Sequence, residues 1–130
     1  MRSASRVLFA FSALCMAAGG YLHSISFPKA AGVLSRSNLP DLFTAAFKGL
    51  WLSDSATLLG LALVFGFMAL RPHSVTRPLT LLLGLVPLAC ALCIYSTMGN
   101  FFAGHILLLS GGAVLLGGAL QREKQPAASA

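Results

Sequence analysis

Residues 50–70 read LWLSDSATLLGLALVFGFMAL, and this stretch decides the fold of the chain. About 20 consecutive apolar residues are enough for a helix to cross the hydrocarbon core of a bilayer. Asp54 is the only charged side chain within the stretch. A charge in hydrocarbon costs on the order of 3 kcal/mol, so it normally faces the interior of a helix bundle and has a partner there. The stretch therefore predicts a transmembrane helix that carries one acid in need of a partner.

Three other stretches have the same apolar character, and they cover residues 7–27, 78–97 and 101–120. The chain has 130 residues, of which 57% are hydrophobic and 9% are charged. Since a soluble domain has about 25% charged residues, this chain has too little polar surface to be one. We therefore predict an all-α membrane protein, a bundle of four transmembrane helices that forms a single domain over residues 1–124. Residues 125–130 are predicted to be a flexible tail.

The basic residues predict the orientation of this bundle, because cytoplasmic loops carry an excess of Lys and Arg. If both termini lie inside, more basic residues are inside than outside. The inner set is Arg2, Arg6, Arg71, Arg77, Arg122 and Lys124, and the outer set is Lys29, Arg36 and Lys48. We therefore predict an N-in/C-in topology. The net charge of +6 comes from residues at the ends of apolar stretches, which indicates contact with anionic lipid and argues against nucleic-acid binding.

Residues 28–49 are the outer connecting segment between the first and second spans. Pro28 is predicted to end the first helix, because proline removes a backbone donor. Pro40 and Asp41 suit the start of another helix, and apolar residues recur at helical spacing after them. We predict a short outer amphipathic helix before the second span, either bent away near Gly49 or continuous with that span. An ordered loop over the bundle is the alternative.

Polar side chains from all four spans are predicted to lie in one layer near the outer face. Counting 1.5 Å per residue along each helix places His23, Asp54 and His105 about one turn inside the outer ends of their spans. It places Tyr95 near the outer end of the third span. Ser53 and Ser55 flank Asp54 in the sequence. The candidate ligand-binding or proton-relay residues are therefore Asp54, His23, His105, Tyr95, Ser53 and Ser55.

Several interpretations of this layer stay open. The first is a hydrogen-bonded structural lock, and the second is a proton or cation relay, since a membrane Asp near His residues can change its protonation state. The third is a transition-metal site, because His23, Asp54 and His105 offer two imidazoles and a carboxylate, as zinc, iron or copper sites do. Two histidines at one depth would also suit a haem. The chain has no nucleophile elbow, phosphate-binding loop or dinucleotide fingerprint, which favours a non-enzymatic protein.

Small residues predict where the helices pack closely, since they let helices approach within lipid. Gly104, Gly111 and Gly118 recur every seven residues in the fourth span and are predicted to contact a neighbouring helix. Two further sets share helix faces that we predict to point inward. The set in the first span is Ser12, Met16, Gly19 and His23, and the set in the third is Cys90, Cys93 and Thr97.

The segments LWLSDS, residues 50–55, and GNFFAGH, residues 99–105, resemble those of small, uncharacterised bacterial inner-membrane proteins with four spans. This resemblance implies a multi-pass inner-membrane protein and no particular activity. Because a bundle this small encloses little volume, a homo-oligomer or docking onto a larger membrane complex is expected. We predict an accessory or small-ligand-binding membrane protein. The alternatives are a small oligomeric transporter that uses Asp54 and a metal-binding membrane protein or enzyme.

Overall fold

The computed structural model describes residues 2–121, and most of them lie in four helices. These are α1 (Arg2–Leu34), α2 (Asp41–Leu70), α3 (Arg77–Met98) and α4 (Phe102–Ala119). All four helices are long and apolar enough to cross a membrane, so the prediction of an all-helical protein with four candidate spans is confirmed. The inner charges Arg122 and Lys124 and the tail 125–130 lie outside the described residues.

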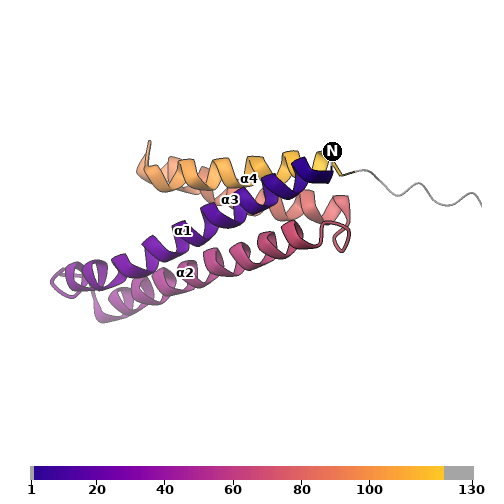
Figure 1. Ribbon diagram of the computed structural model, residues 1–130. Coiled ribbons are helices and arrows are strands. Elements are labelled where there is room, and N and C mark those ends of the chain that lie inside the picture. Colours follow the sequence, from indigo (N-terminus) through magenta and orange to yellow (C-terminus); the bar gives the residue numbers. More distant parts are fainter. Residues whose placement is uncertain (1, 122–130) are drawn as a thin grey trace, which may run out of the picture.

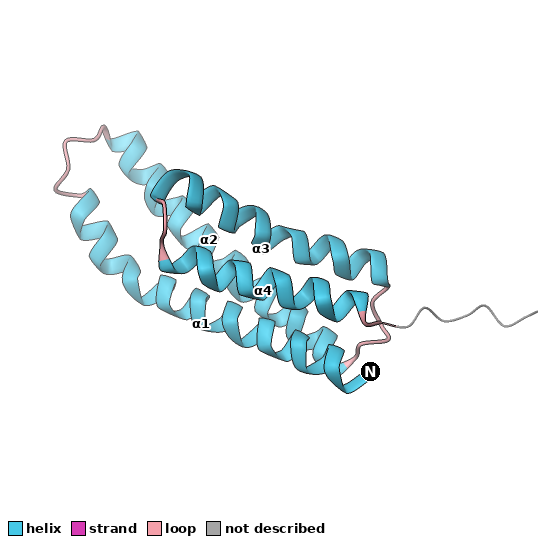
Figure 2. Cartoon of the chain, turned by 90° about the horizontal axis from the view of Figure 1, so that it is seen from above, coloured by secondary structure: helices cyan, strands magenta, loops and turns pink. Residues whose placement is uncertain are grey.

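The helices are arranged as two hairpins that meet through α1 and α4 (Figures 1 and 2). The extensive contacts join α1 to α2, α3 to α4, and α1 to α4. The contacts therefore run in the order α2–α1–α4–α3, and α2 and α3, which follow one another in the chain, share no extensive contact within the described residues. The α1–α2 hairpin also projects beyond the turn between α3 and α4 (Figure 1). We call the end of the molecule that carries this hairpin tip the outer end, after its predicted side of the membrane.

Two of the predicted helix boundaries differ from the structure, namely the end of the first helix and the start of the second. Helix α1 continues through Pro28 to Leu34, and α2 begins at Asp41 and continues through Gly49 without a break. The outer segment therefore contains no separate helix: it extends both helices beyond the predicted spans, and residues 35–40 form the connection between them. Proline deprives one carbonyl of its helical partner, but contacts across the hairpin offset this single loss. Lys48 Nζ, for example, donates to Ser35 Oγ at 3.0 Å across the tip.

The core of the molecule lies where α1 crosses α4. Phe9, Met16, Phe65, Met68 and Val114 are fully buried there. Ser12 and Met16 of the first span point inward as predicted, since both are fully buried. The third span differs from the expectation. Cys90, Cys93 and Thr97 are exposed, whereas α3 buries the opposite set, Thr80, Gly84, Pro87 and Ala91.

Glycines allow α4 to approach α3 closely. Gly104, Gly111 and Gly118 are all buried. A Cβ on Gly104 would lie 2.7 Å from Tyr95 Cε1, and one on Gly118 would lie 2.9 Å from Thr80 Cγ2. Such distances are shorter than carbon–carbon contact, so these positions leave no room for a side chain. This close approach brings Tyr95 of α3 to the outer end of α4.

Two serines form the polar contact at the α1–α4 crossing. The hydroxyls of Ser12 and Ser110 hydrogen-bond to each other, and Ser12 Oγ also lies 3.1 Å from the Ser110 carbonyl oxygen. Both residues are fully buried. In a membrane protein such a contact contributes about 0.6 kcal/mol on average. The pair therefore fixes the register of α1 on α4 more than it adds stability.

We expect Ser12→Ala and Ser110→Ala each to cost about 1 kcal/mol or less. The double variant should cost little more than either single one, because replacing both partners leaves no unpaired hydroxyl. Unfolding by sodium dodecyl sulfate in mixed micelles, followed by circular dichroism, measures all three variants. If the two single losses simply add in the double variant, the hydroxyls do not interact.

Candidate functional site

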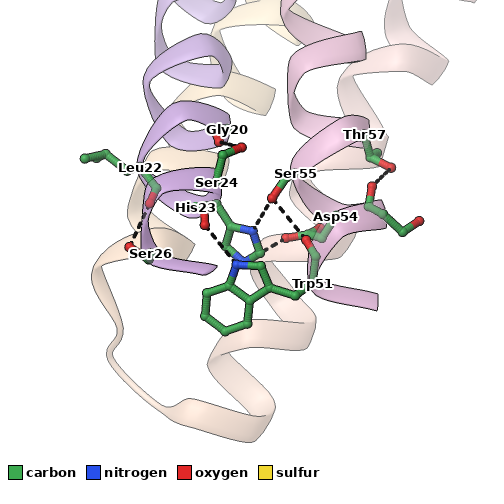
Figure 3. A network of polar contacts seen from close by, with 10 residues as sticks. Gly20, Leu22, His23, Ser24, Ser26, Trp51, Asp54, Ser55 and Thr57 are labelled. Atoms are coloured by element: carbon green, nitrogen blue, oxygen red, sulfur yellow. Dashed lines mark hydrogen bonds and ion pairs between the residues drawn. The ribbon is translucent and has the colours of Figure 1, made fainter. Parts of the chain in front are cut away.

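His23 of α1 and Asp54 of α2 meet near the outer end of the hairpin (Figure 3). His23 Nε2 lies 3.4 Å from Asp54 Oδ2, and His23 Nδ1 lies 2.9 Å from Ser55 Oγ. Consecutive residues of α2 therefore contact the two nitrogens of one imidazole ring. The acid identified from the sequence has a partner, and that partner comes from the neighbouring helix.

Trp51, one turn before Asp54 and Ser55, completes this cluster. Its ring stacks on the His23 ring with centroids 4.3 Å apart and planes 15° from parallel. Its Nε1–H donates to the His23 carbonyl oxygen at 2.8 Å. Ser55 Oγ in turn lies 3.0 Å from the Trp51 carbonyl oxygen. We call His23, Trp51, Asp54 and Ser55 the outer polar cluster. Its contacts fix the His23 ring from one face and from both nitrogens.

The cluster can hold His23 in either protonation state. A carboxylate only accepts hydrogen bonds, so the Asp54 carboxylate at 3.4 Å favours the forms of His23 that carry a hydrogen on Nε2. If the imidazole is neutral, Nδ1 accepts from the Ser55 hydroxyl. If it is protonated, Nδ1 donates to Ser55 Oγ, and the Ser55 hydroxyl donates to the Trp51 carbonyl. When His23 gains or loses this proton, only the Ser55 hydroxyl has to rotate, and every contact of the imidazole ring is kept.

The groups of the cluster differ in their access to the surroundings. The side chain of Asp54 is 56% exposed and that of His23 is 26% exposed, whereas Ser55 is buried. An exposed ion pair contributes only about 0–1 kcal/mol to stability. The His23–Asp54 pair therefore contributes little to holding α1 against α2. Because the Asp54 side chain is exposed, its carboxylate oxygens remain accessible to a ligand.

Ser55, His23 and Asp54 comprise the residue types of a hydrolase triad, but their arrangement does not fit nucleophilic catalysis. In such a triad the serine faces the substrate and the acid is buried behind the histidine. Here the serine is buried and the acid is exposed. Ser55 also lies within α2, where it cannot form the sharp turn that exposes a nucleophile. This geometry supports binding over hydrolysis.

The other predicted site residues lie elsewhere. Tyr95 Oη and His105 Nδ1 are 2.6 Å apart, and their rings are 5.6 Å apart at an angle of 54°. This second pair joins α3 to α4, following the close approach at Gly104. Ser53 is exposed, and its carbonyl accepts a hydrogen bond from Thr57 Oγ1 at 2.9 Å.

The predicted layer is therefore divided into two pairs. His23 and Asp54 come together on one hairpin, and Tyr95 and His105 on the other. Within residues 2–121, no group of three or more His, Cys, Asp or Glu side chains is placed to hold a metal ion. His105 is thus not brought to His23 and Asp54 as a third ligand.

An apolar groove adjoins the outer polar cluster, and the sequence prediction missed it. The groove has a volume of about 460 Å³ and shares Trp51 with the cluster. Its lining residues are Ser26, Lys29, Ala30, Val33, Leu34, Phe47 and Trp51. The prediction failed because a helix ending at Pro28 cannot form the α1 wall. The helical spacing of Ser26, Ala30 and Val33 was the available signal.

Comparisons of the chain with known protein families, with characterised proteins and with solved structures found no match. The interpretation of the site therefore depends on its own geometry.

Proposed function

We propose that this protein is a non-enzymatic integral membrane protein that binds a small ligand at the outer end of the α1–α2 hairpin. The observation that carries the proposal is the shared wall between the outer polar cluster and the apolar groove. Trp51 stacks on His23 and also lines the groove. A site with apolar walls and a few fixed polar groups is typical of small-molecule binding, and about 460 Å³ is within the usual size range.

The helical spacing on α2 supports a continuous site. Phe47, Trp51 and Asp54 stand at i, i+4 and i+7, so they share one face of the helix. Phe47 and Trp51 line the groove, and the half-exposed Asp54 carboxylate follows them toward the membrane. A ligand of this site therefore has an apolar part and a polar part. The proposed setting is the bacterial inner membrane, N-in/C-in, with self-association or a larger complex covering the remaining apolar faces.

The test uses Trp51, which is the only tryptophan of the chain. Its indole N–H gives one resonance in a ¹⁵N-labelled sample, and that resonance reports on both the cluster and the groove. We would titrate decanoate, decylamine and decanol into the protein in phosphatidylcholine nanodiscs. Saturable movement of the indole resonance by at least one of these probes supports the proposal. No movement with any of them would overturn it.

Asp54→Asn is expected to weaken binding of the best probe about fivefold. Asparagine removes the charge that holds His23, and His23 supports the Trp51 wall; a loss of about 1 kcal/mol is the upper range for an exposed pair. The free energy of unfolding should change by about 1 kcal/mol or less. The titration of the indole resonance measures the affinity.

Asp41→Asn is the matched control for Asp54→Asn. It makes the same charge change at an exposed acid of the hairpin tip, outside the cluster and the groove, and should bind like the wild type. If Asp54→Asn also binds like the wild type, the cluster is only a structural contact between α1 and α2.

A small oligomeric proton-coupled transporter is the second candidate, favoured by the continuous contacts from Asp54 through His23 to Ser55. The packing below the cluster argues against a path within one chain. A Cβ on Gly20 would lie 2.9 Å from Leu59 Cγ, and Met16 is fully buried one turn deeper. Proton flux through proteoliposomes that is lost in Asp54→Asn would favour the transporter over the binding protein.

A further inference from the structure

We propose that the ligand of the groove is an anionic phospholipid of the outer leaflet. Its phosphate would lie at Lys29, and part of one acyl chain would lie along Val33, Leu34 and Phe47. This inference depends on the proposed function, since it names the ligand of the same site.

The groove has apolar walls and a basic residue beside them. Ala30, Val33, Leu34, Phe47 and Trp51 supply apolar surface. Lys29 lines the groove with the aliphatic part of its side chain, since the accessible lining is entirely apolar, and within residues 2–121 its ammonium group has no hydrogen bond or ion pair. An unpaired cation beside apolar surface is complementary to an anion that carries an apolar chain. Lysine is a common phosphate-binding residue.

The other basic side chains of the tip are already engaged. Arg36 Nε donates to the Gly32 carbonyl oxygen at 3.1 Å, and Lys48 Nζ donates to Ser35 Oγ at 3.0 Å. The first contact is local to the end of α1, and the second joins α2 to the residue that follows α1. Lys29 is thus the cation of the tip that lines the groove and remains open to a ligand. Asp54, the acid of the outer polar cluster, lies against His23.

The position of the groove favours a lipid over a free anion. Helices α1 and α2 run without interruption from the candidate spans into the groove walls, so a lipid of the same leaflet can enter from the side. A basic residue close to a membrane surface attracts anionic lipid with about 1 kcal/mol. Inorganic phosphate would have no apolar part to fill the groove and would remain hydrated.

The experiment compares lipid retention by wild type and variants. The protein would be transferred from nanodiscs of equal phosphatidylglycerol and phosphatidylcholine into detergent, and the retained lipids counted by native mass spectrometry. We expect the wild type to retain phosphatidylglycerol preferentially, and Lys29→Gln to retain about fivefold less of it. Lys48→Gln is the matched control, with the same charge change on the same tip, and should retain the wild-type amount. Ala30→Leu fills the groove and should lose the lipid although Lys29 is present.

The outcomes separate this inference from the proposed function. Equal retention of the two lipids, or equal losses in Lys29→Gln and Lys48→Gln, would overturn the lipid assignment. Release of the bound lipid by millimolar inorganic phosphate alone would also overturn it, since the site would then select the anion without its chain. If at least one of the decanoate, decylamine and decanol probes still moves the Trp51 resonance in any of these cases, ligand binding stands with another ligand. If they do not, both proposals fail together.

Discussion

Gly111→Ala is expected to destabilise the protein by about 1–3 kcal/mol, as overpacking of a closely packed interface does. A Cβ at Gly111 would lie 2.7 Å from Leu88 Cγ and 2.9 Å from the Gly84 carbonyl oxygen. A side chain can rotate away, but a backbone carbonyl of α3 cannot. The added methyl group must therefore push α4 away from α3 along their whole contact. Unfolding by sodium dodecyl sulfate and thermal inactivation in detergent measure the loss.

The adjacent glycine supplies the control for this prediction. A Cβ at Gly112 would meet no atom within 4 Å, so Gly112→Ala should change the free energy of unfolding by about 0.5 kcal/mol or less. The two variants differ only in the direction that one methyl group points. If Gly111→Ala and Gly112→Ala are equally stable, α3 and α4 pack less closely at Gly111 than these distances indicate.

Trp51→Ala is expected to lose ligand binding and about 3 kcal/mol of stability, the lower end for replacing a packed tryptophan, because the side chain is partly exposed. The substitution removes the ring that stacks on His23, the N–H that donates to the His23 carbonyl, and one wall of the groove. We expect phosphatidylglycerol retention to fall at least tenfold. Native mass spectrometry measures it without a tryptophan signal.

Trp51→Phe separates the two roles of this residue. Phenylalanine keeps a ring between His23 and the groove but has no N–H, so the cost should be about 1 kcal/mol, that of one hydrogen bond. Lipid retention should stay close to that of the wild type. If Trp51→Ala retains as much lipid as Trp51→Phe, Trp51 is a structural contact and not a wall of the site.

Much of the fold could be predicted from hydropathy alone. The third and fourth spans, expected at 78–97 and 101–120, agree closely with Arg77–Met98 and Phe102–Ala119. Charged and glycine-containing breaks bound both of these apolar runs, so their ends are visible in the sequence. The end of α1 was not visible, because Pro28 is a strong local signal against a helix. Tertiary contacts with α2, which are not a local property, outweigh it.

The sequence predicts a depth for each residue of the candidate site but not the partner of that residue. Counting along a helix predicts a level for His23, Asp54, Tyr95 and His105, but not which helices are neighbours. The structure pairs α1 with α2 and α3 with α4, so His105 contacts Tyr95 and is not brought to Asp54. The role of Lys29 was missed for the same reason, since the sequence shows a surface lysine and only the hairpin gives it a groove.

The order α2–α1–α4–α3 has a consequence for how the chain is assembled during synthesis. Each hairpin consists of consecutive helices, so α1–α2 can insert and pair before α3 has left the ribosome, and α3–α4 can follow as an independent unit. Lateral docking of preformed helices is the second stage of membrane-protein folding. Here that stage reduces to a single event, the meeting of α1 with α4 at Ser12 and Ser110. The ligand groove belongs entirely to the first-made hairpin, so it can be complete before the second half of the protein exists.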